Sequence, residues 1–145
     1  MFVLDTNVVS ELRKARSGEA NQNVVDWANS VPAPLLFISA VTVLELEIGV
    51  RLALRRDPEQ GRLLRTWLDQ QVLPAFSDRV LAIDTAVALR CAGLHVPEPR
   101  SERDALIAAT AMVHSMSVVT RNTDDFEKVD VPLINPWLPV THPAR

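Results

Sequence analysis

The sequence predicts a single α/β domain, with a central, mostly parallel sheet of about five strands and helices on both faces. Short apolar runs without polar alternation are separated by longer amphipathic segments, a pattern typical of strands covered on both faces and joined by helices. The length of 145 residues fits one domain. A hydrophobic fraction of 48% with 23% charged residues is enough to build a buried core.

The elements follow from these runs and from the residues that interrupt them. Five strands are predicted at residues 2–4, 35–38, 80–83, 118–120 and 133–134. Helices are predicted from Thr6 until Gly18 closes that unit, over 19–29, 39–57, 58–72, 85–94 and 101–116, with a short helical turn over 122–127. Prolines mark the breaks at 32 and 34, beyond residue 72, and in the linker 97–100. The domain is expected to span residues 1–145, with a proline-rich tail from about residue 136.

Composition excludes several classes of protein. A formal net charge of -3 argues against binding nucleic acid simply by coating phosphates, although a nuclease built on carboxylates remains compatible with it. No apolar run reaches the roughly 18 residues of a membrane span, and the N-terminus has no basic and apolar leader, so a cytoplasmic location is expected. One cysteine and four scattered glycines argue against a disulfide, a thiolate metal site and a phosphate-binding loop.

Polar residues gather where the predicted strands end. Asp5 follows the first strand and Asp84 the third, while Thr120 ends the fourth and is followed by a polar turn. That turn contains Asn122, Asp124 and Asp125. Because the carboxyl ends of parallel strands meet at one edge of the sheet, these side chains are expected to converge there.

Two further acids lie within apolar helix faces. Glu45 shares a stripe with Val41, Ile48 and Leu52, whereas Glu47 is spaced to pair with Arg51 on the surface. The same helix has a second apolar face, which we expect a subunit interface to cover; it consists of Val43, Leu46, Val50 and Leu54. Asp104 shares its face with small residues that allow close approach. Carboxylates that converge from separate elements can hold a hard cation such as Mg²⁺ or Mn²⁺.

Each acid also has a structural interpretation. Asp5 and Asp84 can cap the helices that follow them, and for Asp84 the cap is the favoured interpretation. Ser101 and Asp104 have the spacing of a capping box, so Asp104 can serve a helix start without any metal.

Five motifs, in order along nearly the whole chain, resemble those of the PIN-domain nucleases, in particular the VapC-like and FitB-like toxins of prokaryotic toxin–antitoxin pairs. The motifs are Phe2-Val3-Leu4-Asp5-Thr6-Asn7, Ser39-Ala40-Val41-Thr42-Val43-Leu44-Glu45-Leu46, Arg103-Asp104-Ala105-Leu106-Ile107-Ala108-Ala109-Thr110-Ala111, Val119-Thr120-Arg121-Asn122 with Asp125-Phe126, and Ile134-Asn135-Pro136-Trp137.

The resemblance implies a site and a reaction. It makes Asp5, Glu45 and Asp104 the metal-holding acids of a Mg²⁺-dependent ribonuclease, with Mn²⁺ as a substitute and either one or two ions. The fourth catalytic acid is assigned to Asp125, with Asn122 and Asp124 as alternatives. The residues implied to position substrate or metal are Thr6, Asn7, Thr120, Arg121 and Asn122. A water activated by the metal and a carboxylate would attack the RNA phosphodiester.

The resemblance also implies partners: RNA, a cognate antitoxin protein, and a second copy of the chain in a homodimer or a higher assembly. Basic residues near the site could contact the RNA backbone; they are Arg13, Lys14, Arg16, Arg51, Arg100, Arg103 and Arg121. Two rival hypotheses remain. One is a metal-dependent phosphatase or receiver-like domain, and the other is an inactive PIN-like module that only binds RNA or a partner, which Asn122 favours.

Overall fold

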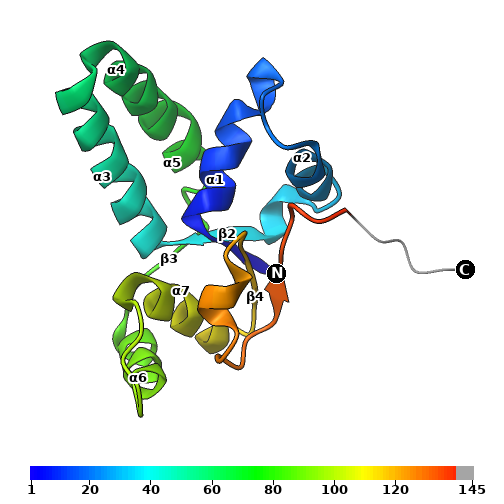
Figure 1. Cartoon of the computed structure of the whole chain (residues 1–145), viewed down its shortest axis with the longest axis vertical. Coiled ribbons are helices and arrows are strands. Elements are labelled where there is room, and N and C mark those ends of the chain that lie inside the picture. The colour runs from blue at the N-terminus through cyan, green and yellow to red at the C-terminus, as the bar shows by residue number, and fades with distance from the viewer. Residues whose placement is uncertain (140–145) are drawn as a thin grey trace, which may run out of the picture.

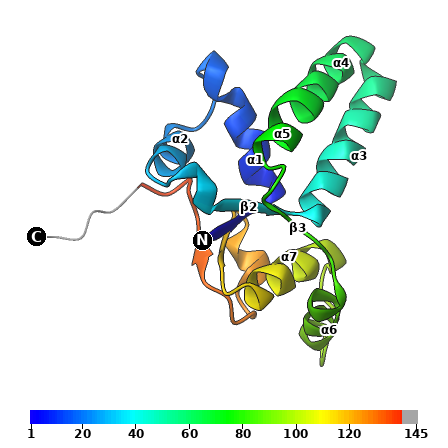
Figure 2. The same cartoon turned by 180° about the vertical axis from the view of Figure 1, so that it is seen from behind.

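The structure, a computed structural model, describes residues 1–139. Figures 1 and 2 show the two opposite views of a sheet with helices on either side. The predicted proline-rich tail from about residue 136 is described only as far as residue 139, and residues 140–145 lie outside the described part. Within residues 1–139, no helix is long and apolar enough to cross a membrane.

The sheet has five strands, and every pair of neighbours is parallel. Its order is β3-β2-β1-β4-β5, so β1 lies at the centre and the chain crosses from one half of the sheet to the other after β3. The strands are β1 (Phe2–Leu4), β2 (Leu36–Ser39), β3 (Val80–Leu81), β4 (Ser117–Val119) and β5 (Leu133–Ile134). Phe2 is in register with both Leu36 and Ser117, which sets the carboxyl ends of the three inner strands side by side. This arrangement confirms the predicted sheet.

Helical segments connect the strands. They are α1 (Thr6–Leu12), η1 (Arg13–Ser17), α2 (Gln22–Asn29), η2 (Ala33–Leu35), α3 (Ala40–Arg56), α4 (Pro58–Trp67), η3 (Leu68–Val72), α5 (Leu73–Ala75), α6 (Thr85–Leu94), α7 (Glu102–Val113) and η4 (Thr123–Phe126). Local capping explains several starts. The Ser39 hydroxyl accepts from the Val41 N–H, and the Asp84 carboxylate accepts from the Val87 N–H at 3.0 Å, which confirms the cap predicted for Asp84.

Alternate strand residues face the two layers of helices. Leu4 and Val119 belong to a core with α1, α2, α3 and η3, whereas Val3 and Val118 pack against α7 and η4. In Figures 1 and 2, α1, α3, α4 and α5 lie on one side of the sheet, while α6 and α7 lie on the other. The polar edge of the sheet lies between these layers, because β1, β2 and β4 all end there.

Two predicted helices differ from the structure at their ends. The helix expected to stop before Pro74 continues through a π-helical segment, η3, into α5. Pro74 is tolerated because it lies in the first turn of α5, where a backbone N–H is not needed. The helix predicted to reach residue 116 ends at Val113, since Ser115 takes a left-handed conformation with φ 56° and turns the chain into β4. Other boundaries differ by one to three residues.

The second apolar face of α3 does not need a subunit to cover it, which corrects the sequence-based expectation. Leu46 and Val50 are buried in the core of the same chain, and Val43 and Leu54 pack against it. Part of the cover is α4, which returns antiparallel beside α3 (Figure 1). Gly61 allows the close approach, because a Cβ there would lie 2.5 Å from the Leu54 Cα. Homodimer formation stays a prediction.

Candidate active site

Asp5 is the most buried carboxylate of the predicted acids, with 6% of its surface exposed. It caps α1, since its Oδ1 accepts from the Thr6 N–H at 2.8 Å. Its Oδ2 accepts from the Thr120 hydroxyl at 2.8 Å and from the Asn7 amide at 3.3 Å. The residue is therefore both a helix cap and a part of the polar edge, so the two interpretations left open by the sequence hold together.

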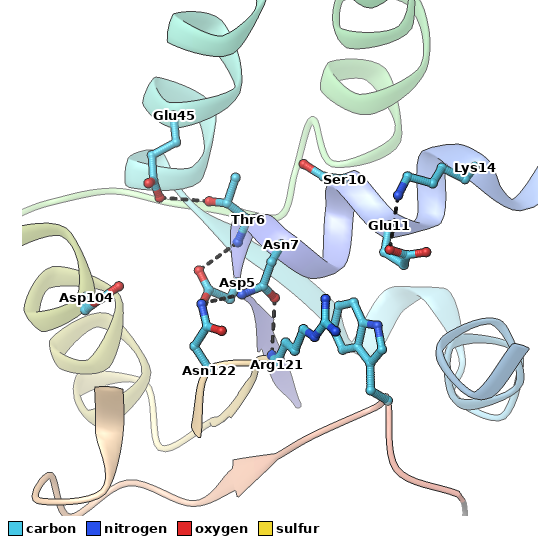
Figure 3. A pocket seen from close by; sticks show the side chains of 11 residues that line it. Asp5, Thr6, Asn7, Ser10, Glu11, Lys14, Glu45, Asp104, Arg121 and Asn122 are labelled. Atoms are coloured by element: carbon cyan, nitrogen blue, oxygen red, sulfur yellow. Dashed lines mark hydrogen bonds and ion pairs between the residues drawn. The ribbon is translucent and has the colours of Figure 1, made fainter. Parts of the chain in front are cut away.

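Glu45 reaches the same edge from α3. Its Oε1 accepts from the Thr6 hydroxyl at 2.9 Å (Figure 3). Its Oε2 lies 3.7 Å from the Arg103 guanidinium. Thr6 thus contacts Asp5 through its backbone and Glu45 through its side chain. One threonine at the start of α1 sets two of the predicted acids relative to each other.

Asp104 lies in the first turn of α7. The capping box predicted for it does not form, because the side chain of the N-cap residue Ser101 accepts no hydrogen bond from a backbone N–H of that turn. Burial raises the pKa of Asp104, and the nearby charges of Asp5 and Asp125 raise it further, while a Ser101 side-chain hydrogen bond to Asp104 itself lowers it. Burial also raises the pKa of Asp5, and the charges of Glu45 and Asp125 add to the rise. The hydrogen bonds from Thr120 and Thr6 lower this pKa but do not cancel the effect of burial. Burial and neighbouring negative charges therefore both disfavour the charged forms of Asp5 and Asp104.

These acids line one open pocket of about 460 Å³ (Figure 3). Its lining residues are Asp5, Thr6, Asn7, Ser10, Glu11, Lys14, Glu45, Asp104, Arg121, Asn122 and Trp137. The pocket therefore collects the three predicted metal-holding acids from β1, α3 and α7, together with the predicted Thr6, Asn7, Arg121 and Asn122. Thr120, also predicted, lies fully buried beneath it and bonds Asp5.

Ser10, Glu11 and Trp137 line the pocket although no role was predicted for them, whereas Lys14 in η1 was predicted as a possible RNA contact. Ser10, Glu11 and Lys14 follow Asn7 at helical spacing and line the same pocket. This spacing of 7, 10, 11 and 14 was a signal available in the sequence. Trp137 ends the fifth motif of the family resemblance, but no role was assigned to it, because its position at the pocket depends on the return of the chain after β5.

The positions after β4 divide the three alternatives for a fourth acid. Asn122 lines the pocket, and its backbone N–H donates to the Thr120 hydroxyl at 3.0 Å. Asp125 does not line the pocket, yet its charge raises the pKa of both Asp5 and Asp104. Asp124 neither lines the pocket nor contributes to the pKa shifts of Asp5 and Asp104. The geometry keeps Asp125 and Asn122 as neighbours of the acids and removes the argument for Asp124.

The basic residues predicted to surround the site are distributed unevenly. Lys14 and Arg121 line the pocket, and Arg103 lies beside Glu45. Arg51 is instead paired with Glu47, and Arg100 donates to the Leu94 carbonyl at 3.0 Å. Few of the seven are thus placed to meet a substrate in the pocket.

The donor set suits a hard divalent cation. Carboxylate oxygens are the ligands such ions prefer, and the pKa values of Asp5 and Asp104 are raised first by burial and then by neighbouring negative charges, both of which a bound cation would offset. In the part of the chain that the structure describes, no three His, Cys, Asp or Glu side chains are grouped closely enough to hold an ion as they stand. Mg²⁺ usually keeps several waters and takes one or two carboxylates directly. The arrangement therefore fits an ion with direct bonds to some of the acids and water-mediated contacts to the rest.

Comparison with known proteins identifies the same fold and family. A family model for the PIN domain matches residues 2–132. The chain is 37% identical to Toxin FitB of Neisseria gonorrhoeae over 142 residues, covering 94% of this chain and 99% of that protein. It is 38% identical to VapC ribonuclease Y4jK of Sinorhizobium fredii over 144 residues, covering 96% and 99%. The crystal structure of FitAcB from Neisseria gonorrhoeae superposes with a TM-score of 0.84 at 37% identity, covering 94% of this chain and 99% of that one.

Proposed function

The chain belongs to the PIN-domain family, and from that membership we propose that it is a ribonuclease toxin of a toxin–antitoxin pair that hydrolyses RNA phosphodiester bonds. The observation that carries the proposal is the convergence of Asp5, Glu45 and Asp104, from three separate elements, on one open polar pocket. The names of two relatives, a toxin and a ribonuclease, support it.

We propose that cleavage depends on Mg²⁺, or on Mn²⁺ in its place. The residues that would hold the ion are Asp5, Glu45 and Asp104. When bound, it supplies positive charge that neutralises the acids, stabilises the charge that develops on the phosphate and activates water. Whether one ion or two bind depends on whether Asp125 takes part.

The chain's own residues organise this reaction in distinct ways. Thr120 and Asn7 donate to Asp5 and fix its Oδ2, while the backbone of Thr6 fixes its Oδ1. The Thr6 hydroxyl orients Glu45. Because the pocket is open, RNA can reach the acids without a conformational opening.

Asp104 and Asp125 complete the acidic side of the pocket. Asp104 lines the pocket with Asp5, and Asp125 is close enough that its charge raises the pKa of both groups. The Asn122 amide can donate to a phosphate oxygen. Together these groups would give the site acids to hold a cation and a hydrogen-bond donor for the phosphate.

The partners follow from the chemistry of a toxin. A cell that makes an RNA-cleaving protein must keep it inhibited, so we propose a cognate antitoxin that covers the acidic pocket, with a basic side chain neutralising the carboxylates. We also propose that the protein acts in the cytoplasm, where its RNA substrate is found. A homodimer, or a larger assembly with the antitoxin, is part of the same proposal.

One feature supports a second candidate, an inactive module that only binds RNA or a partner. Asn122, an amide and not an acid, lines the pocket, whereas Asp125, the residue assigned as the fourth acid, does not. If the fourth acid were indispensable, the site would bind RNA and metal without cleaving. Asp125 is the group that decides between the two candidates.

The test is cleavage of labelled single-stranded RNA by the purified protein, with Mg²⁺ or Mn²⁺ and with EDTA. Asp104→Asn is expected to abolish cleavage, while Asp124→Asn, which removes an equal charge from the neighbouring turn, is expected to leave it intact. RNA cleavage that persists in EDTA or in Asp104→Asn would contradict the proposal. Metal-dependent RNA binding without cleavage would favour the inactive module.

A further inference from the structure

Arg121 differs from the other pocket cation in its surroundings. Lys14 lies 3.5 Å from the Glu11 carboxylate, so part of its charge is already compensated. Across residues 1–139, no ion pair involves Arg121. An uncompensated guanidinium beside a pocket of acids is matched to an anion that the acids alone would repel, such as a phosphate of the RNA backbone.

Arg121 is held at both ends. Its backbone N–H donates to the Asn7 side-chain oxygen at 3.3 Å, and the Asn7 amide in turn donates to Asp5. Its guanidinium lies over the Trp137 ring, 5.3 Å from the centroid. The main chain of Arg121 is therefore tied to the acids, and its charged end is tied to an aromatic face.

Trp137 is itself a fixed support. Its ring packs against the core, its backbone N–H donates to the Asn135 side chain at 3.0 Å, and its carbonyl accepts from the Asn23 amide at 2.8 Å. Asn23 lies on α2, so the turn after β5 is anchored to the helical layer. A ring with these restraints cannot follow a mobile arginine and instead limits where the guanidinium can go.

We propose that Trp137 is a positioning residue that holds the Arg121 guanidinium at the mouth of the pocket, ready to bind an RNA phosphate next to the one being cleaved. This inference rests on the proposed function. A free arginine loses side-chain freedom when it binds a phosphate, and a restrained one has lost much of it already. Trp137 acts on RNA through Arg121 and not by stacking on a base.

The experiment measures the affinity of a labelled, mixed-sequence single-stranded RNA by fluorescence anisotropy, with Mg²⁺, in the Asp104→Asn background, where the RNA stays intact. Arg121→Gln is expected to weaken binding about tenfold. It should also reduce the slope of log affinity against log salt by about 0.7, the value for one phosphate contact on a single strand. Arg90→Gln, which removes the same charge from the exposed surface of α6, should change neither.

Trp137→Leu is expected to weaken binding about two- to fivefold, the range of a cation–π contact at an exposed site, and Trp137→Phe should restore most of the loss. In the Arg121→Gln background, Trp137→Leu should have no further effect. Thermal unfolding is measured for the Asp104→Asn parent, for Arg121→Gln and Trp137→Leu in that background, and for the combination of the two. It separates the coupling between Trp137 and Arg121 from a general loss of stability, because a purely structural effect of Trp137 would be the same with and without Arg121.

Two results would overturn the inference while leaving the proposed function in place: an equal loss of affinity from Trp137→Leu in both backgrounds, as for base stacking, or no change in the salt slope with Arg121→Gln. If the unmodified chain binds RNA no better than an unrelated acidic protein and does not cleave it in Mg²⁺ or Mn²⁺, the proposed function itself fails and takes the inference with it.

Discussion

Replacing Thr120 by valine tests whether the bond beneath Asp5 organises the site. The Thr120 side chain is fully buried, and its hydroxyl donates to the Asp5 carboxylate at 2.8 Å. Valine has the same shape without the hydroxyl, so the change removes the hydrogen bonds and little packing. The Asn122 N–H, which donates to that hydroxyl at 3.0 Å, loses its acceptor as well.

The magnitude follows from the chemistry of the bond. A hydrogen bond to a charged group contributes about 1.5–3 kcal/mol, so the free energy of unfolding should fall by about that amount at neutral pH, and the melting temperature by roughly 5–10 °C. Thr120 lowers the pKa of Asp5 against the effect of burial, so its loss should raise that pKa further. Affinity for Mg²⁺ should fall about 10- to 100-fold, as is usual when a residue supporting a metal ligand is lost.

Calorimetric titration with Mg²⁺, the pH profile of RNA cleavage and thermal unfolding measure these effects. Thr110→Val is the matched control. Thr110 is equally buried, but its hydroxyl donates to the Leu106 carbonyl within α7, away from Asp5. The control should lose some stability and keep its metal affinity. If Thr120→Val binds Mg²⁺ as tightly as Thr110→Val, the bond to Asp5 does not organise the site.

Three further changes have outcomes fixed by the structure. The folded-state pKa of Asp5 lies above its usual value, so without metal the free energy of unfolding should fall as pH rises past about 3.8. Asp5→Asn should flatten this fall and melt at a higher temperature than the parent at pH 7. Equal melting curves of the two proteins would contradict this. Gly61→Ala should cost about 1–3 kcal/mol in denaturant unfolding, because the new Cβ would meet the Leu54 backbone at 2.5 Å. Arg65 lowers the pKa of Glu47 to about 2, so Glu47 stabilises the fold above its usual pKa of 4.5 and loses that effect as pH falls towards 2. Glu47→Gln should remove this part of the unfolding transition in acid. An unchanged transition would show that the Glu47–Arg65 pair does not stabilise the fold.

The sequence was informative where local rules decide the structure. The short apolar runs predicted the strands, because residues buried on both faces leave no alternation. Asp84 was correctly expected to be a cap, since the chain after it begins a helix at once. Asp5 was expected at the polar edge because parallel strands end together there, while Glu45 and Asp104 were singled out on apolar helix faces and joined to it by the family resemblance; the pocket contains all three.

The sequence was less informative where the outcome depends on contacts between distant segments. The apolar face of α3 looked uncovered because the return of α4 beside it depends on the close contact at Gly61. Pro74 was expected to lie beyond a helix, but a π-helical segment leads the chain through it. Trp137 belongs to a recognised motif, but its place at the pocket comes from the order of β4 and β5 and its bond to Asn23, which the motif alone does not predict.

Asp5 illustrates why the structural and functional interpretations of one residue need not exclude each other. A carboxylate at the end of β1 caps the next helix through one oxygen and faces the pocket with the other. Local rules describe the first role. The second depends on Thr120 and Asn7, and thus on how the strands are ordered.

The central claim is that Asp5, Glu45 and Asp104 together hold a catalytic cation. The most direct measurement is a crystal structure of the protein soaked in Mn²⁺, with anomalous scattering used to locate the ion. We expect a peak in the pocket bounded by these three acids, and its loss in Asp104→Asn together with the loss of RNA cleavage. An ion bound elsewhere, or a protein that cleaves RNA with no ion in this pocket, would contradict the claim.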